Sequence, residues 1–374
     1  MKLEMVDLRN QYKKVKTEID QAILSVIENA NFINGEQVSI FSNNLSTYLD
    51  NSNVIPCANG TDALQIAMMA LNLNPGDEVI VPAFTYVATA EVLGLLQLRP
   101  VLVDVDPKTF NISTDSIKQA LSSKTKAIVP VHLFGQCADM EEILNFAKEN
   151  HLYVIEDTAQ AIGAIYKFQD GRTRKAGTLG DIGCTSFFPS KNLGCYGDGG
   201  SLYTHNSQLA TIIRMICNHG QVKKYVHKYI GVNSRLDTIQ AAILNIKLKY
   251  LDEYNNARLL AADEYDKLLS GVHGIEIPFR SINTTHVFHQ YTIKVKDNKR
   301  DNLKSFLEKQ GVPAMIYYPI PLNKQEAYNN ICRIPSNLSI TEELCNEVLS
   351  LPMHSELTQD QIEFITNQIK SFFN

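Results

Sequence analysis

A lysine with reactive potential lies in the segment 185–200, TSFFPSKNLGCYGDGG. Lys191 is flanked there by aromatic, small and glycine residues, which favour burial of its side chain. Desolvation disfavours the charged ammonium, so burial would lower the pKa of Lys191 and supply the neutral amine that a Schiff base requires. The ordinary alternative is an exposed lysine on a loop, because a lysine side chain usually keeps its amine in water.

An acidic residue follows a short apolar run in the segment 153–160, YVIEDTAQ. A carboxylate at this position, Asp157, could pair with the protonated ring nitrogen of pyridoxal phosphate and make that ring a better electron sink. Asp157 could equally be the N-cap of a following helix. The segment alone leaves both interpretations open.

A possible phosphate site lies in the segment 59–63, NGTDA, which opens a predicted helix. A helix N-terminus presents unpaired N–H groups and the positive end of the helix dipole. Gly60 allows a ligand to approach closely, and the hydroxyl of Thr61 lies beside it, so the loop could bind phosphate. Taken alone, the segment favours the simpler interpretation of a capped helix start with Thr61 or Asp62 as N-cap.

A fourth polar segment, GVNSRL at residues 231–236, precedes a long predicted helix. Asn233 and Arg235 could contact an anionic ligand, or the segment could be a polar helix start. The four segments together supply a phosphate cradle, a ring-nitrogen partner and a Schiff-base lysine. No H-E-x-x-H, EF-hand, G-x-S-x-G or early G-x-G-x-x-G motif offers a competing chemistry.

The first part of the chain alternates between short apolar runs and helical stretches. The runs occupy residues 78–82, 100–105, 127–131 and 153–155, and helical patterns occupy residues 11–29, 63–71, 89–96 and 140–149. Continuous apolar strands separated by helices predict an α/β fold with a mostly parallel central sheet sandwiched by helices. Ligands bind such sheets at the carboxyl ends of the strands, where the segments described above begin.

The later part of the chain predicts a smaller α+β domain. A helical pattern runs without a break over residues 239–269, residues 289–295 alternate like a half-exposed strand, and residues 300–310 and 360–372 read as helices. We expect a large domain at residues 1–245 and a small C-terminal domain at residues 246–374.

The bulk composition excludes several classes of protein. Lys and Arg total 35 against 40 Asp and Glu, which argues against a nucleic-acid-binding scaffold. Seven cysteines form no C-x-x-C pair, so no metal site is expected, and their odd number favours a reducing cytoplasm. The chain shows neither a signal peptide nor an apolar run of membrane-spanning length.

The chain resembles the DegT/DnrJ/StrS family of sugar aminotransferases over almost its whole length. The resemblance rests on CANGTDALQIA, VPAFTYVATAE, IEDTAQAIGA, TSFFPSKNLGCYGDGG, GVNSRLDTIQAAIL, YYPIPLNKQEAY and LPMH. It implies the fold type I, aspartate aminotransferase-like architecture. It also implies pyridoxal 5'-phosphate (PLP) as cofactor, which passes through its amino form, PMP, during turnover.

The resemblance assigns roles to residues of this sequence. Lys191 would bind the cofactor as a Schiff base and move the proton, and Asp157 would pair with the ring nitrogen. Tyr86 would stack on the ring, and Gln160 would lie near the ring hydroxyl. Asn233 would reach the cofactor phosphate of a neighbouring subunit, which implies a homodimer with shared active sites. The residues that would hold the phosphate within the subunit are Gly60, Thr61, Asp62 and Ser186.

Within the family, SFFPSKNLGCYGDGG, NHGQ, IGVNSRLDT and YPIPLNKQ are most similar to members that aminate the 3-keto carbon of a UDP-N-acetyl-hexuronic acid. Those members take the amino group from L-glutamate, release 2-oxoglutarate and supply surface polysaccharide precursors such as those of the O-antigen. Tyr317 departs from their pattern, which has histidine there. The candidate substrate contacts are His219, Arg235, Tyr317 and Tyr318.

Three alternatives remain beside that substrate. One is a dTDP- or UDP-linked 3- or 4-keto-6-deoxyhexose, since Arg235 also occurs in relatives that act on uncharged hexoses. Another is a regulatory protein of the same fold without catalysis, and the last is a sugar dehydratase. The pair of Lys191 and Asp157 argues against the regulator, and Lys191 argues against the dehydratase, because dehydratases of this family have histidine in its place.

Overall fold

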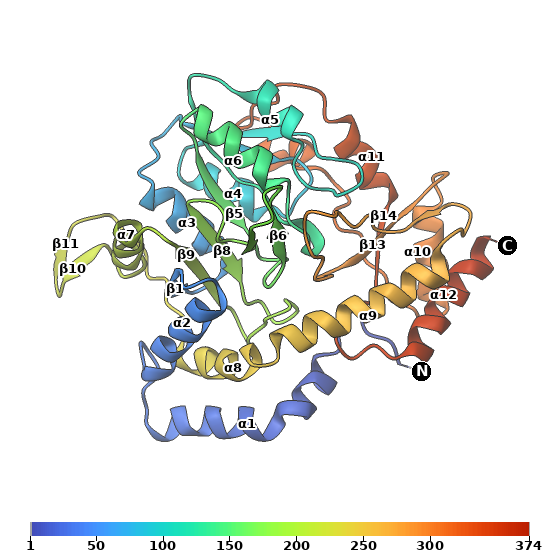
Figure 1. The fold of residues 1–374 in the computed structure, drawn as a ribbon, viewed down its shortest axis with the longest axis horizontal. Coiled ribbons are helices and arrows are strands. Elements are labelled where there is room, and N and C mark those ends of the chain that lie inside the picture. Colours follow the sequence, from blue (N-terminus) through green and yellow to red (C-terminus); the bar gives the residue numbers. More distant parts are fainter. Residues whose placement is uncertain (1, 374) are drawn as a thin grey trace.

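A seven-stranded sheet forms the centre of the protein, whose computed structural model describes residues 2–373 (Figure 1). The strand order is β1-β9-β8-β5-β4-β2-β3, and only β9 runs antiparallel to its neighbours. The predicted α/β class with a mostly parallel sheet is therefore confirmed. The strands are β1 (Asn53–Cys57), β2 (Glu78–Pro82), β3 (Arg99–Val103), β4 (Thr125–Ile128), β5 (Tyr153–Asp157), β8 (Ile182–Ser186) and β9 (Gly200–Thr204).

Helices cover both faces of this sheet, which explains why its strands are continuously apolar. Successive side chains of a strand point to opposite faces. In β2, Val79 and Val81 join the apolar cluster beneath α3, α4 and α7, whereas Ile80 joins the cluster beneath α5 and α6. The helices are α3 (Gly60–Ala70), α4 (Ala88–Leu95), α5 (Thr114–Ala120), α6 (Met140–Glu149) and α7 (Ser207–Cys217).

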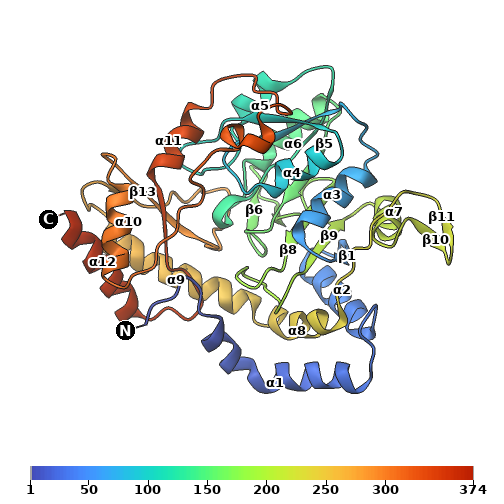
Figure 2. The ribbon, with the colours of Figure 1, turned by 180° about the vertical axis from the view of Figure 1, so that it is seen from behind.

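The opening helix lies outside the sheet layers, along one edge of the molecule (Figures 1 and 2). As predicted, residues near the N-terminus form a long helix, α1 (Leu8–Glu28), and it packs on α8 (Thr238–Leu248). Val15 and Ile19 of α1 meet Ile243 of α8. The second helix, α2 (Glu36–Tyr48), packs on the other side of α8 and on β1.

The prediction of one continuous helix over residues 239–269 is wrong. The chain forms α8 and then a separate helix, α9 (Leu251–Leu269), with Lys249 and Tyr250 between them. The two helices bury their apolar residues against different partners, because α8 packs on α1 and α2 whereas α9 packs on α12. One uninterrupted helix would not follow both surfaces, and the apolar pattern by itself does not reveal this break.

The C-terminal part forms a second, smaller α+β layer. Its antiparallel sheet has the order β12-β13-β14 and packs with α9, α10 and α12. Both ends of the described chain lie at this side of the molecule (Figure 1). The elements are β12 (Ile275–Glu276), β13 (Tyr291–Val295), α10 (Arg300–Lys309), α11 (Ser339–Glu347), β14 (Val348–Leu351) and α12 (Gln359–Phe373).

The predicted half-exposed strand at residues 289–295 is instead fully buried, as β13. Its polar residues find partners inside the protein. The hydroxyl of Thr292 lies 2.8 Å from that of Ser350, and the ammonium of Lys294 contacts Glu276 at 2.6 Å and the carbonyl of Pro107 at 3.0 Å. The alternation of polar and apolar residues in this segment therefore reflects polar groups that are paired inside the protein, not polar groups that face solvent.

The remaining elements are short. They are β6 (Ile165–Lys167), β7 (Thr173–Lys175), β10 (Gln221–Lys223), β11 (Val226–His227) and the 3-10 turns η1 (Leu133–Gly135), η2 (Leu322–Lys324) and η3 (Glu326–Tyr328). The predicted domain boundary at residue 245 lies inside α8, and this division of the chain stays a proposal. Among residues 2–373, no helix combines the length and apolar character needed to cross a membrane.

Candidate active site

Two sequence-predicted residues lie at the carboxyl ends of neighbouring parallel strands. Asp157 ends β5, where it is paired in register with Cys184 of β8. Lys191 lies on the loop that leaves β8. The two side chains are close enough for each charge to act on the pKa of the other. The structure therefore brings both residues to the edge of the sheet at which ligands of parallel sheets bind.

The carboxylate of Asp157 is buried and accepts hydrogen bonds from a neighbouring and from a distant part of the chain. It accepts hydrogen bonds from the N–H of Ala159 at 3.1 Å and from the hydroxyl of Thr89 at 3.2 Å. Burial raises its pKa, against the opposing effects of these hydrogen bonds and the positive charge of Lys191. Residues 159–163 form turns, so the alternative in which Asp157 caps a following helix is wrong.

The side chain of Lys191 is half-buried. Burial lowers its pKa to about 8, and the negative charge of Asp157 opposes that shift. A substantial fraction of the amine is therefore neutral near physiological pH, as nucleophilic attack on a carbonyl requires. This environment matches the sequence-based prediction for this lysine.

The predicted phosphate cradle is the N-terminus of α3. The N-cap of this helix is neither Thr61 nor Asp62, the two residues predicted for it. Asn59 is the cap, because its side chain accepts a hydrogen bond from the N–H of Asp62 at 2.8 Å. Among residues 2–373, the N–H groups of Gly60 and Thr61 have no hydrogen-bond acceptor. These donors at the positive end of an 11-residue helix are suited to a phosphate.

Gly60 also brings this cradle against the end of β8. A Cβ atom at residue 60 would lie 2.7 Å from the Cβ of Ser186, which is too close for any other residue type without a backbone shift. Ser186 is five positions before Lys191 in the chain. The anion-binding helix terminus, the amine and the acidic partner thus meet at one edge of the sheet. This donor set fits PLP, which needs a phosphate site, an amine and a carboxylate.

Aromatic and amide side chains line the same region. The side-chain amide of Gln160 donates to the hydroxyl of Tyr318 at 3.1 Å, while its oxygen accepts from the N–H of Phe134 at 2.8 Å. The exposed ring of Tyr86 lies 6.3 Å from the ring of Tyr318. The structure therefore brings these sequence-predicted residues together, and Tyr317 follows at 6.0 Å from Tyr318.

The other sequence-predicted residues lie on a separate segment. His219 and Asn233 are exposed, and residues 218 and 233 form an isolated antiparallel bridge. Ser234 links the segment to the cradle, because its hydroxyl accepts from the N–H of Ala58 at 3.0 Å. Arg235 lines a cavity of about 420 Å³ together with Arg214. This segment is thus adjacent to the cradle but leaves Asn233 pointing away from the buried core.

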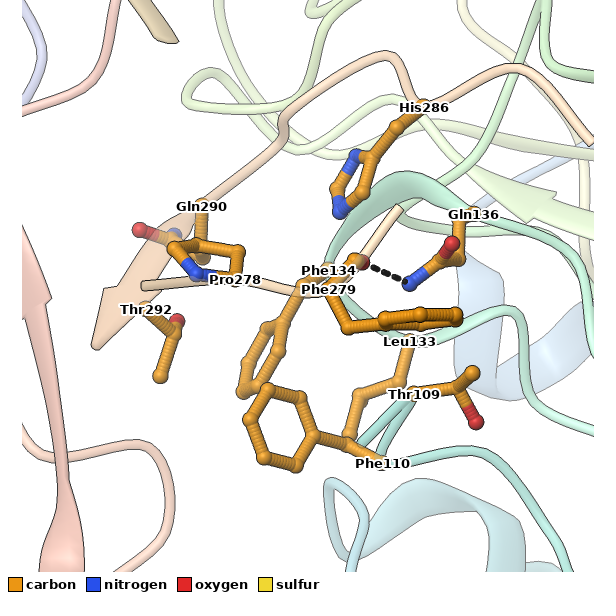
Figure 3. Close-up of a pocket in the computed structure, with 10 residues that line it drawn as sticks. All are labelled: Thr109, Phe110, Leu133, Phe134, Gln136, Pro278, Phe279, His286, Gln290 and Thr292. Atoms are coloured by element: carbon orange, nitrogen blue, oxygen red, sulfur yellow. Dashed lines mark hydrogen bonds between the residues drawn. The ribbon is translucent and has the colours of Figure 1, made fainter. Parts of the chain in front are cut away.

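A second, much smaller cavity has Phe134 in its lining (Figure 3). Its volume of about 10 Å³ suits roughly one water molecule. One wall is fixed by the amide of Gln136, which donates to the carbonyl of Phe279 at 3.0 Å. None of the sequence-predicted site residues lines this cavity, which is too small for a cofactor or sugar.

Three residues near the site escaped the sequence reasoning. Thr89 binds Asp157 from α4, Asn192 follows the lysine, and His289 is buried beside Lys191, whose charge contributes to lowering the pKa of His289 after the larger effect of burial. Only Asn192 carried a signal, its position next to Lys191. The others come from distant parts of the chain, and no local pattern links them to the lysine.

Comparison with known proteins decides the family. The model of the DegT/DnrJ/EryC1/StrS aminotransferase family matches residues 13–370. The chain belongs to this family. The predicted membership is therefore confirmed, and the chain is an aminotransferase that uses PLP, the cofactor of the DegT/DnrJ/EryC1/StrS enzymes.

Individual relatives match across nearly the full chain. A UDP-2-acetamido-2-deoxy-3-oxo-D-glucuronate aminotransferase of Pseudomonas aeruginosa is 46% identical over 97% of this chain and 98% of its own. A pleiotropic regulatory protein of Geobacillus stearothermophilus is 43% identical over 100% of this chain and 99% of its own. Both similarities extend beyond the cofactor site to the whole DegT/DnrJ/EryC1/StrS fold.

A solved structure of the family superposes closely. DesV of S. venezuelae, in complex with a ketimine intermediate, has a TM-score of 0.95 and 34% identity, and the match covers 100% of this chain and 99% of that one. The agreement extends to the small C-terminal layer, so the predicted fold type I architecture is confirmed for this DegT/DnrJ/EryC1/StrS member.

Proposed function

We propose that this enzyme transfers the amino group of L-glutamate to the 3-keto carbon of a UDP-N-acetyl-hexuronic acid, within surface polysaccharide precursor synthesis. The observation that carries the proposal is the 46% identity, over nearly the full length of both chains, with the Pseudomonas aeruginosa aminotransferase named for a 3-oxo-glucuronate. The free thiols of all seven cysteines agree with a reducing cytoplasm as its compartment.

In this proposal Lys191 and Asp157 carry the chemistry. The bound cofactor supplies a conjugated ring that withdraws electrons from the carbon that loses its proton. Lys191 Nζ would take that proton from one of the two reacting carbons and return it to the other, a task suited to an amine with a pKa of about 8. The carboxylate of Asp157 holds a positive charge on the ring nitrogen. The N–H groups of Gly60 and Thr61 and the hydroxyl of Ser186 would bind the phosphate. The N–H of Asp62 already donates to Asn59, so Asp62 would help only by shaping the helix start.

The side chains proposed for the substrate suit an anionic sugar nucleotide. Arg235 and Arg214 both line the cavity of about 420 Å³, and guanidinium groups bind phosphates and carboxylates in pairs of hydrogen bonds. Neither Lys191 nor Asp157 lines this cavity. Tyr317 and Tyr318 would contact the sugar, and His219 would contribute from the exposed segment. Tyr86 would cover the ring, and Gln160 would lie near its hydroxyl.

A panel of amino-sugar nucleotides tests the substrate. Incubated with 2-oxoglutarate, the enzyme should convert the 3-amino derivative of UDP-N-acetyl-hexuronic acid back to the ketone and form glutamate, as read by mass spectrometry. We expect a preference of about 10²-fold over neutral 6-deoxyhexoses, since a site built for a carboxylate loses its ion pair with them. Faster turnover of a dTDP- or UDP-linked 3- or 4-amino-6-deoxyhexose would replace the proposed substrate.

The same assay tests a second function. The 43% identity with a pleiotropic regulatory protein is the observation behind the regulatory alternative, although the chain belongs to an aminotransferase family. Such a protein would convert no member of the panel although it binds PLP. A dehydratase, in contrast, would remove a hydroxyl group without forming glutamate, and the presence of Lys191 argues against it.

We further propose a homodimer in which Asn233 completes the phosphate site of the partner subunit. The β10–β11 hairpin projects from the body beside α7 (Figure 1). This region exposes apolar side chains. Tyr225 is 81% exposed and Ile230 is 89% exposed. Clustered apolar groups on a projecting arm favour burial against another chain. Asn233 is exposed at the base of this arm, where it could reach across.

Mixing two defective variants tests the shared site. Lys191→Ala and Asn233→Ala should each be impaired alone, and an equal mixture that exchanges subunits should recover about a quarter of the wild-type activity, because half of the dimers then contain one intact site. Steady-state activity before and after subunit exchange measures this recovery. If mixing restores no activity although hybrid dimers form, Asn233 acts within its own subunit or not at all.

A further inference from the structure

The residue that follows Lys191 is tied to two other parts of the molecule. Asn192 is buried, and its side-chain amide donates hydrogen bonds to Asn255 Oδ1 at 2.7 Å and to the carbonyl of Val287 at 2.9 Å. Asn255 belongs to α9, and Val287 precedes β13. The side chain of Asn192 thus joins the loop that carries Lys191 to helix α9 and to the small C-terminal layer.

Asn255 extends this connection to the acidic side of the active site. Its own amide donates to the carbonyl of Ile162 at 3.2 Å, in the turns that follow Asp157. A Cβ atom at Gly163 would lie 2.6 Å from the amide nitrogen of Asn255, so a glycine is needed there for the approach. The amide pair therefore contacts the segments of both Lys191 and Asp157.

The lysine itself has few other restraints. Within residues 2–373 the Lys191 amine makes no hydrogen bond or ion pair, and the local loop bond runs from the N–H of Lys191 to the carbonyl of Phe188 at 2.8 Å. The side chain of Asn192, the next residue of the loop, donates the hydrogen bonds nearest to Lys191 that tie the loop to other parts of the molecule. Since a displacement of about 1 Å can cost roughly 10²-fold in rate, this tether matters for catalysis.

We propose that the Asn192–Asn255 amide pair is the positioning element that holds the Lys191 amine at a fixed place relative to the Asp157 carboxylate. This inference rests on the proposed role of Lys191 as the cofactor lysine. The same contact brings the segment of Val287 against the loop, and His289, two residues further on, is buried beside Lys191 with no partner for its Nδ1 among the described residues. The small C-terminal layer thereby helps to build the site.

Asn192→Ala and Asn255→Ala, made in the full-length enzyme, test this role against a matched control. Asn245 is also a buried amide in a pair, since it accepts from Asn44 at 3.1 Å and donates to the carbonyl of Gln37 at 3.0 Å, but it lies between α2 and α8. We expect similar losses of thermal stability in all three variants. Only the two site variants should lose kcat, by about 10²-fold, with a much smaller change in KM.

A readout independent of turnover separates positioning from general destabilisation. In the cofactor-free protein, added PLP should attach to Lys191 about tenfold more slowly in Asn192→Ala than in Asn245→Ala, as followed by absorbance. The double variant of Asn192 and Asn255 should lose little more than either single variant, because the two side chains act as a unit. Asn192→Leu serves if the alanine variant does not fold, since leucine has a similar size and carries no charge but cannot donate.

A trapping experiment on the wild-type enzyme distinguishes failure of the proposed function from failure of the positioning role. Borohydride reduction followed by peptide mass spectrometry should place the cofactor on Lys191. A label at another lysine removes the proposed function and this inference with it. A label at Lys191, combined with kcat and attachment rates in the Asn192 variants equal to those of Asn245→Ala, overturns the positioning role alone.

Discussion

Lys191→Ala should lower kcat/KM by about 10⁴-fold or more, since the variant loses the group that moves the proton as well as the amine that holds the cofactor. The protein should still fold, because Lys191 makes no side-chain hydrogen bond or ion pair within residues 2–373 that the change would break. The absorbance band of the covalently attached cofactor should disappear. Steady-state kinetics, a spectrum of the PLP-treated protein and a thermal melt together measure these effects.

A second buried lysine provides the control. Lys247 is fully buried, its pKa is also lowered to about 8 by burial, and its amine has no hydrogen-bond partner in the described structure. It belongs to α8 rather than to the lysine loop. Lys247→Met should therefore keep the cofactor band and change kcat/KM by less than about threefold. Retained turnover in Lys191→Ala would assign the chemistry to a different residue.

Asp157→Asn should lower kcat by about 10³-fold while leaving the local structure in place. The amide keeps the shape of the side chain, and its oxygen can still accept from the N–H of Ala159 at 3.1 Å. It carries no negative charge, however, and so cannot stabilise a protonated ring nitrogen. We expect a thermal midpoint close to that of the wild type. Burial raises the pKa of Asp157, which means that its charge is unfavourable inside the protein, and the substitution removes this charge.

The same variant changes the titration of the lysine in a direction that can be measured without substrate. The negative charge of Asp157 raises the pKa of Lys191, against the larger lowering effect of burial. Removing that charge should move the pKa of Lys191 from about 8 to a lower value, as followed by the pH dependence of PLP attachment. Asp181→Asn, which alters a carboxylate that accepts from the N–H of Val154 at 2.8 Å at the other end of β5, serves as the control. An unchanged midpoint in Asp157→Asn would place the two side chains out of electrostatic reach.

The site was predicted from sequence where its residues belong to local patterns. Short apolar runs identify strands, and the rule for parallel sheets then places Asp157 and the lysine loop at one edge. The helix start at residues 59–63 was predicted correctly, although the cap is Asn59 rather than Thr61 or Asp62. These features depend on the order of neighbouring residues, so one sequence suffices to find them.

Other features depend on which distant segments pack together. The break between α8 and α9 follows from two different packing partners, and β13 is buried because its polar side chains find partners on β12, β14 and the loop before α5. Neither outcome is encoded in the apolar pattern of the segment itself. Periodicity reports which residues differ in polarity along an element but not what covers the element.

The sequence by itself determined the family, the fold class and the residues proposed to bind the cofactor, because those properties reside in contiguous motifs and their order. Only the tertiary structure decided how Lys191 is held, since Asn192, Asn255 and Val287 meet across 63 and 95 residues of chain. It also decided the pKa of the lysine amine, which is lowered to about 8 because the surrounding segments partly shield it from water. Desolvation is a property of the packed whole, and no local motif carries it.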